Sequence, residues 1–146
     1  MKSRSLSAAL LIVLAAFTPV VAAEQPAIYR LIVHPRNPAS SVKRVTLRDA
    51  FLKKIKHWPH GTVIHPADLV ADSRVRHEFS EQVLGRSVAA VKAYWQQKIF
   101  SGRDIPPPEF DRDEKVVAYV LTHEGGVGYV SGTAKLRGSK VLTVVP

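Results

Sequence analysis

Short β-branched runs alternate with amphipathic helical segments along this chain, and this alternation limits the possible folds more than any other feature. Residues 28–33 are apolar apart from Arg30 and are followed by His34, as in a largely buried strand, and residues 127–130 and 141–145 repeat the pattern near the other end. Helical periodicity fills the stretches between them. The sequence therefore predicts an α/β domain whose mainly parallel sheet is flanked by helices.

The first helical segment is predicted to begin at Leu47, with Thr46 as its N-cap and Phe51 on its buried face. The motif Trp58-Pro59-His60-Gly61 then ends the segment, and residues 62–65 are predicted to form a second strand. Strand, helix and strand in this order predict a right-handed parallel crossover.

Two further helices are predicted in the middle of the chain. The first covers residues 74–84, with Ser73 before it and Gly85 at the position of a left-handed C-terminal cap. The second follows Ser87 and has four apolar residues spaced to bury one face: Val88, Val91, Trp95 and Ile99. A last helix, capped by Asp111, is predicted to run through His123.

Residues 1–23 have the pattern of a signal peptide. Lys2 and Arg4 precede an apolar run over residues 6–17, which is followed by the small-residue cleavage site Val21-Ala22-Ala23. An uncleaved membrane anchor is the alternative, but it needs about 18 or more uninterrupted apolar residues. Cleavage after Ala23 predicts a periplasmic protein with one domain, residues 24–146.

The chain contains no cysteine, so its stability must come from packing rather than from disulfides or thiolate metal sites. Residues 1–23 hold two of the 21 basic residues and no acidic residue, which leaves 19 basic against 12 acidic side chains, a net charge of +7. Such a charge favours anionic solutes or an anionic envelope surface, since nucleic acid is scarce outside the cytoplasm. A basic surface that only keeps the protein soluble is the alternative.

Three segments, in this order, resemble one family: residues 46–61 (TLRDAFLKKIKHWPHG), 72–79 (DSRVRHEF) and 125–130 (GGVGYV). They resemble the periplasmic phosphate-binding proteins of ABC transporters, whose matching segments contain Phe-Leu-Gly-Lys, Ser-Gly-Thr and Gly-Ala-Ile-Gly-Tyr-Val. The resemblance covers roughly residues 28–145, which corresponds to about one lobe of a two-lobed protein. It implies a three-layer single lobe of a type-2 periplasmic binding protein.

The candidate ligand site is the loop of residues 69–76. Ser73 offers a hydroxyl before a helix start, whose free N–H groups attract anions, and Arg74 and Arg76 add positive charge. The resemblance points to the same Ser73, although the family's Gly-Thr is replaced by Arg74-Val75 and its preceding Arg by Leu69. An ordinary N-cap is the alternative role of Ser73.

Ser40 and Ser41 follow the first strand and could add hydroxyls to the same anion. A local turn that hydrogen-bonds its own backbone is the alternative. No catalytic motif is present, and His57, His60 and His65 fit no metal-ligand spacing, so we expect neither an enzyme nor a metal or cofactor.

Two functions remain open at this stage. The first is a module that binds phosphate or a similar oxyanion weakly, because one lobe offers only half of the usual ligand cage. Its missing wall would come from a second copy, as a homodimer, or from another envelope protein. The second is an interaction module without a ligand, which docks on an envelope sensor or transporter. Neither function involves nucleic acid.

Overall fold

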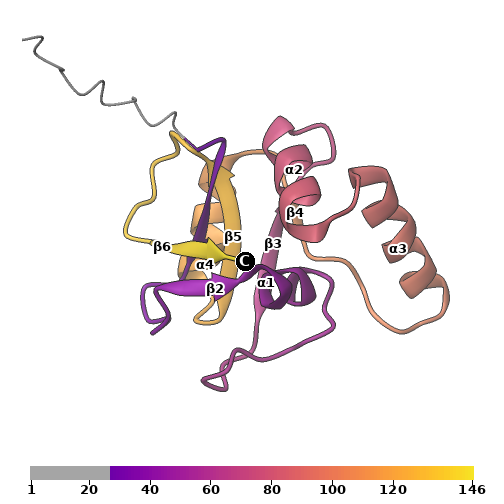
Figure 1. Cartoon of the computed structure of the whole chain (residues 1–146), viewed down its shortest axis with the longest axis horizontal. Coiled ribbons are helices and arrows are strands. Elements are labelled where there is room, and N and C mark those ends of the chain that lie inside the picture. The colour runs from indigo at the N-terminus through magenta and orange to yellow at the C-terminus, as the bar shows by residue number, and fades with distance from the viewer. Residues whose placement is uncertain (1–26) are drawn as a thin grey trace, which may run out of the picture.

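The computed structural model describes residues 27–146, so the predicted signal peptide at residues 1–23 lies outside the described residues. The elements, in chain order, are β1 (Tyr29–Val33), β2 (Ser41–Lys43), α1 (Arg44–Phe51), β3 (His65–Leu69), α2 (Arg74–Phe79), the π-helical turn η1 (Ser80–Leu84), α3 (Val88–Phe100), β4 (Glu109–Phe110), α4 (Asp113–Thr122), β5 (Gly126–Ser131) and β6 (Lys140–Val145). Figure 1 shows their arrangement.

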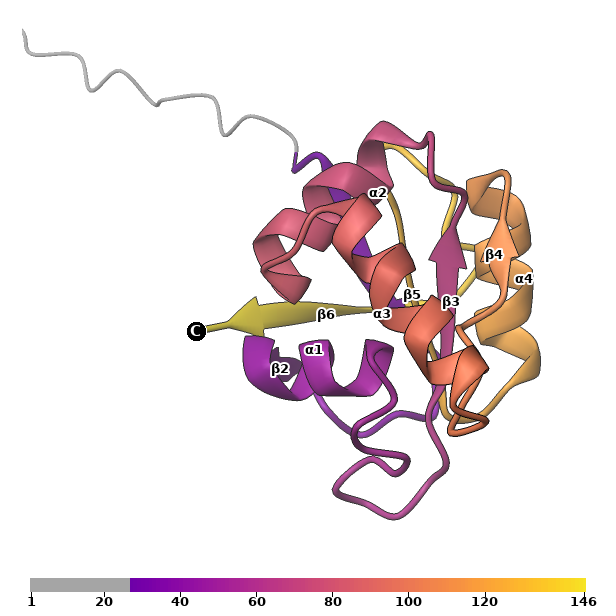
Figure 2. The ribbon, with the colours of Figure 1, turned by 90° about the vertical axis from the view of Figure 1, so that its right-hand side faces the viewer.

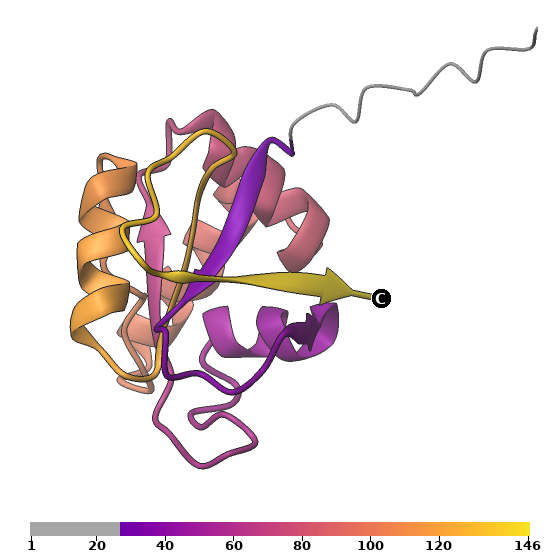
Figure 3. The ribbon, with the colours of Figure 1, turned by 90° about the vertical axis from the view of Figure 1, so that its left-hand side faces the viewer.

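The strands form one six-stranded sheet in the order β2-β6-β1-β5-β3-β4. β1 is antiparallel to both of its neighbours, while β2 is parallel to β6, and β3 is parallel to both β4 and β5. Helix α4 covers one face of the sheet, and α1, α2 and α3 lie on the other (Figure 2 and Figure 3). The predicted three-layer α/β lobe, with helices flanking the sheet, is confirmed, but the sheet is mixed rather than mainly parallel, because β1 pairs antiparallel with both β5 and β6.

The core is aromatic on the α2 face of the sheet and aliphatic on the α4 face. On the α2 side, the rings of Phe79 and Tyr129 stack at a centroid distance of 3.9 Å, and Phe51 packs on Phe79 at 4.8 Å. On the α4 side, Val116 lies so close to Gly128 that a Cβ at this position would be 2.6 Å from its Cγ1. The glycine in β5 therefore allows α4 to pack directly on the sheet.

The predicted strand at residues 62–65 is wrong, because the second long strand, β3, runs from His65 to Leu69. Pro66 is tolerated there because the backbone N–H groups on its side of the strand point toward β4. Asp68 N donates to Pro108 O at 2.9 Å, but β4 begins only at Glu109, so no partner faces Pro66. The predicted parallel crossover is also wrong, because β5 lies between β1 and β3 and β1 runs antiparallel to it.

Two predicted helix starts are wrong as well. Helix α1 follows β2 directly and begins at Arg44, so Thr46 lies inside it rather than at its N-cap. Helix α4 begins at Asp113, and the carboxylate of Asp111 instead lies 2.9 Å from Nζ of Lys115. Neither helix uses a side-chain cap, and α1 begins directly where the pairing of β2 ends.

The predicted end of the first helix at Trp58-Pro59-His60-Gly61 is also wrong, because α1 ends at Phe51 with Leu52 as its C-cap. Three further helix ends agree with the sequence. Ser73 and Ser87 cap α2 and α3 by accepting from the N–H of Arg76 and Ala90, and Gly85 has the predicted left-handed conformation, with φ of 63°. Three of the four apolar residues predicted on the inner face of α3 are buried: Val88, Val91 and Trp95. The fourth, Ile99, is 53 % exposed, because the last turn of α3 extends beyond the core.

Candidate functional site

The Ser73 loop, residues 69–76, connects the carboxyl end of β3 to α2. The chain turns through a hydrogen bond from Ser73 N to Val70 O at 3.1 Å, and Ser73 Oγ accepts from Arg76 N at 3.3 Å. Helix geometry leaves the N–H groups of Arg74 and Val75 without intrahelical acceptors. The loop therefore presents a hydroxyl oxygen and two backbone donors at one end of the sheet, which is the usual position of ligands in α/β folds.

The two arginines of the loop have opposite environments. Arg74 is exposed, so its guanidinium is free to meet an anion from solvent. Arg76 is only 4 % exposed, and its guanidinium points inward, where Nη1 donates to the backbone O of Leu69. The structure thus brings Ser73 and Arg74 together at the surface and places Arg76 beneath them.

Arg76 joins two carboxylates on neighbouring parallel strands. Asp68 in β3 and Glu109 in β4 are register partners, and Arg76 lies 3.3 Å from Asp68 Oδ2 through Nη2 and 2.6 Å from Glu109 Oε1 through Nη1. The Asp68 and Arg76 side chains are 7 % and 5 % exposed, whereas that of Glu109 is 44 % exposed. Arg76 therefore compensates a buried charge, and its guanidinium is already engaged on both sides.

Tyr129 completes this cluster from β5. Its hydroxyl donates to Asp68 Oδ1 and accepts from the N–H of Leu69 at 3.3 Å. Burial raises the pKa of Asp68, and Arg76, Tyr129 and the Leu69 N–H oppose that rise. Burial also raises the pKa of Tyr129, and the adjacent Asp68 charge raises it further. For Arg76, burial lowers the pKa, but Asp68 and Glu109 outweigh it and raise the pKa. The cluster consequently holds one cation against two carboxylates and one neutral phenol.

Ser40 and Ser41 lie far from this loop along the sheet. Ser41 pairs with Thr143 of β6, and Ser40 O accepts from Thr143 N at 3.1 Å, so both belong to the β2 edge. Four strand spacings separate β2 from β3, roughly 19 Å along a flat sheet. The structure does not bring the Ser40-Ser41 pair to the Ser73 loop, so within one chain the two groups do not meet on one small anion.

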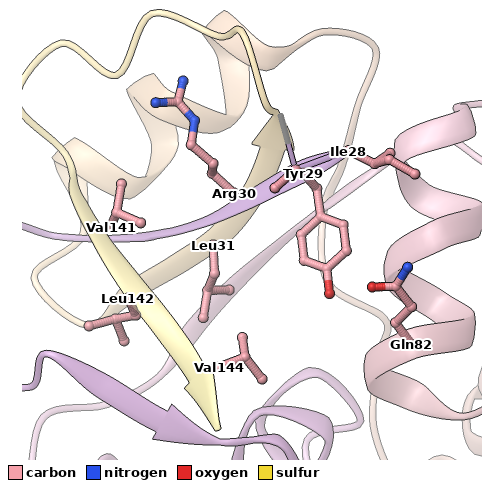
Figure 4. A pocket seen from close by; sticks show the side chains of 9 residues that line it. Ile28, Tyr29, Arg30, Leu31, Gln82, Val141, Leu142 and Val144 are labelled. Atoms are coloured by element: carbon pink, nitrogen blue, oxygen red, sulfur yellow. The ribbon is translucent and has the colours of Figure 1, made fainter. Parts of the chain in front are cut away.

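A separate hollow of about 480 Å³ lies between β1, β6 and η1, and it is mostly apolar. Figure 4 shows Leu31 and Val144 on its wall, with the Tyr29 hydroxyl directed toward the amide of Gln82. Arg30 points away from Tyr29, as alternation along a strand requires, and donates to the backbone O of Ala134. Arg30 is the one cation among the lining residues, and its guanidinium is already engaged by Ala134 O, so the hollow suits an oxyanion less well than the Ser73 loop does.

Sequence reasoning missed Asp68, Glu109 and Tyr129. One signal was available: Arg76, Phe79, Ser80 and Val83 follow helical spacing and are all buried, which places a charged residue on an apolar face. A buried arginine requires a buried carboxylate partner. The sequence does not identify the carboxylates, because Asp68 and Glu109 are brought together beside Arg76 only by the pairing of β3 with β4.

Two negative findings apply to residues 27–146. None of the helices described there is long and apolar enough to cross a membrane. In the same residues, no three His, Asp or Glu side chains gather as ligands of a metal ion would.

Comparisons with protein-family profiles and with curated proteins return no match. Solved structures do match. A structure from Clostridium perfringens, described as a phosphate ABC transporter substrate-binding protein with bound phosphate, has a TM-score of 0.61 at 20 % identity, and an ABC-type phosphate transport receptor from Vibrio cholerae has 0.60 at 17 %. PstS from Borrelia burgdorferi has 0.60 at 10 %.

The similarity covers 80 % of this chain but only 44 %, 45 % and 47 % of those three chains. The chain thus spans less than half the length of the structures that it matches. At these identities the similarity shows the fold alone. The predicted resemblance to phosphate substrate-binding proteins over about one lobe is confirmed at that level.

Proposed function

We propose that this chain, whose fold is similar to one lobe of phosphate ABC transporter substrate-binding proteins, is an exported, non-enzymatic module that binds phosphate or a similar oxyanion. The observation that carries the proposal is the Ser73 loop. It places a hydroxyl, two free backbone donors and the exposed Arg74 at the carboxyl end of β3. The same fold in the Clostridium perfringens structure is described with bound phosphate.

Binding from one side would be weak. An ion on an open loop keeps much of its water, and salt screens the charge of an exposed arginine. Exposed Asp72, next to Ser73, and the two carboxylates around Arg76 lower the local positive potential further. We expect a dissociation constant of about 1 mM or weaker for phosphate. Tighter binding would require a second wall from another copy or from an envelope transporter protein.

Phosphate titration of the ¹⁵N-labelled protein, followed by amide NMR, tests this proposal. The Arg74 and Val75 amides should shift, and the shifts should shrink at physiological salt. Arg74→Ala and Ser73→Gly should each weaken binding, while Ser73→Gly costs only a few tenths of a kcal/mol in capping. Arg112→Ala is the matched control, because Arg112 is also exposed and precedes a helix.

If Arg112→Ala weakened phosphate binding as much as Arg74→Ala, the ion would be attracted only by the net positive charge of the protein. Unshifted Arg74 and Val75 amides would refute the site. Light scattering with and without phosphate would show whether a second copy supplies the missing wall. Substitution of Arg76 is unsuitable for this test, because its side chain belongs to the core.

One observation favours the second candidate, a ligand-free interaction module that docks on an envelope sensor or transporter. The Arg76 guanidinium is neutralised internally by Asp68 and Glu109, so the loop has less charge to offer than its sequence suggests. If neither phosphate nor sulfate shifts the loop amides at millimolar concentrations, this candidate replaces the first.

A further inference from the structure

The C-terminal end of α3 carries the most exposed apolar side chains of the described residues. Phe100 is 95 % exposed, Ile105 66 % and Ile99 53 %. These three residues are close along the chain, at the last turn of the helix and in the extended segment that follows it. Large apolar side chains that are exposed close together, rather than scattered singly, mark surfaces that interact with a partner or a membrane.

Basic side chains surround this apolar end. Lys53 and Lys56, from the segment after α1, each place Nζ 3.8 Å from the carboxylate of Asp104, which lies between Arg103 and Ile105 in the chain. Tyr94 of α3 donates to Leu52 O at 2.8 Å and ties the helix to the same segment. We call the apolar residues Ile99, Phe100 and Ile105 with the cations Lys53, Lys56 and Arg103 the α3 tip.

The α3 tip lies at the opposite end of the sheet from the Ser73 loop. The segment that carries Lys53 and Lys56 is fixed by Trp58, whose Nε1 donates to Gly125 O at 3.1 Å, next to the amino end of β5. Ser73 follows the carboxyl end of β3, which is parallel to β5. A second wall across the Ser73 loop would therefore leave the α3 tip uncovered.

From this juxtaposition we propose that the α3 tip docks the protein on an anionic lipid bilayer surface. Protruding aromatic and aliphatic side chains flanked by Lys and Arg form the pattern of interfacial membrane contact. Apolar groups enter the headgroup boundary, and the cations meet lipid phosphates. Three cations against the single carboxylate of Asp104 give the charge complementarity that this surface requires.

Two other occupants fit the α3 tip less well. A second copy, packed tip to tip, would bring like charges together. A protein partner would need its own pocket for Phe100, because this side chain is 95 % exposed and protrudes from the surface. A fluid bilayer surface adapts to a protruding side chain without such a pocket.

Co-sedimentation with lipid vesicles tests the proposal. Vesicles of phosphatidylcholine with about one third phosphatidylglycerol should bind the protein, pure phosphatidylcholine should not, and added salt should weaken binding. Phe100→Ser with Ile105→Ser should lower the partition coefficient about tenfold or more, from lost apolar burial. Lys56→Gln with Arg103→Gln should lower it about twenty-five-fold, at about fivefold for each cation.

Matched controls keep the result specific to this surface. Val45→Ser removes an exposed apolar side chain from α1, and Lys43→Gln with Lys135→Gln removes the same charge from other exposed positions. Both should leave vesicle binding within about a factor of two. All variants share one N-terminus, so any contribution from residues 1–26 cancels.

Absence of binding to anionic vesicles would overturn the proposal, even if the protein captured an acidic protein instead. Equal losses in the Lys43 and Lys135 control would also overturn it, since diffuse net charge would then explain the binding. An unchanged melting temperature in every variant would confirm that a loss reflects the surface and not the fold.

Discussion

Replacing Arg76 by methionine should destabilise the protein strongly, because it leaves a buried carboxylate without its cation. The Asp68 side chain is 7 % exposed and lies 3.3 Å from Arg76. Breaking a buried ion pair by removing one partner costs about 3–5 kcal/mol. Asp68 keeps the hydrogen bonds from Tyr129 and from the Leu69 N–H, which places the expected loss near the lower end, about 3 kcal/mol.

The pH dependence of this loss identifies its cause. Burial raises the pKa of Asp68 and Arg76 opposes that rise, so the Arg76→Met protein should have a still higher Asp68 pKa in the folded state. Folding then takes up a proton that the unfolded chain does not hold. Stability of the variant therefore rises, relative to the unsubstituted protein, as the pH falls from about 7 to 5.

Urea unfolding, followed by the fluorescence of the buried Trp58 and Trp95, measures these free energies. Arg74→Met is the matched control, because Arg74 is exposed two residues away, and it should change stability by less than about 0.5 kcal/mol. Adding Asp68→Asn to Arg76→Met should restore part of the loss. Equal effects of Arg74→Met and Arg76→Met, or a loss that is independent of pH and of Asp68→Asn, would refute the reasoning.

The remaining predictions concern packing and one histidine. Phe51→Ala should lower the unfolding free energy by about 3–5 kcal/mol, because the ring is 2 % exposed; an unchanged urea midpoint would contradict this. Gly128→Ala should cost about 1–3 kcal/mol, since its Cβ would lie 2.6 Å from Val116 Cγ1, and calorimetry would show no loss if α4 can move away. Burial, His123 and Lys53 lower the pKa of His65, so acidification below its ordinary pKa of 6.5 should reduce stability. His65→Gln should therefore weaken the pH dependence of the melting temperature between about pH 5 and 7. The same substitution of the exposed His60 should leave that dependence unchanged.

Local signals predicted the parts of the fold that depend on neighbouring residues. Ser73, Ser87 and Gly85 end or begin helices through contacts within a few positions, and the structure confirms all three. β2 was missed because only Val42 of its three residues is buried, and its existence depends on pairing with β6 about 100 residues later. β3 was misplaced because Pro66 argues against a strand unless the position of β4 is known.

The candidate site likewise has features that local sequence predicts and features that depend on strand pairing. The capping role of Ser73 and the exposure of Arg74 follow from a helix start, and both could be predicted. The inward position of Arg76 could have been suspected from its helical face, but Glu109 is 33 residues away and meets it only through the β3–β4 register. Whether Ser73 and Arg74 hold an anion stays a prediction.

The position of β1 in the sheet also constrains the order of folding. Within residues 27–146 β1 is the first strand, yet its two partners are β5 and β6, so Arg30 of β1 has no strand partner until Val130 has been synthesised. Such long-range pairing slows folding and leaves strand edges exposed meanwhile. A nascent chain that ends before Gly126 has neither partner strand, so the central sheet cannot assemble until Gly126 and the residues of β5 and β6 have been synthesised.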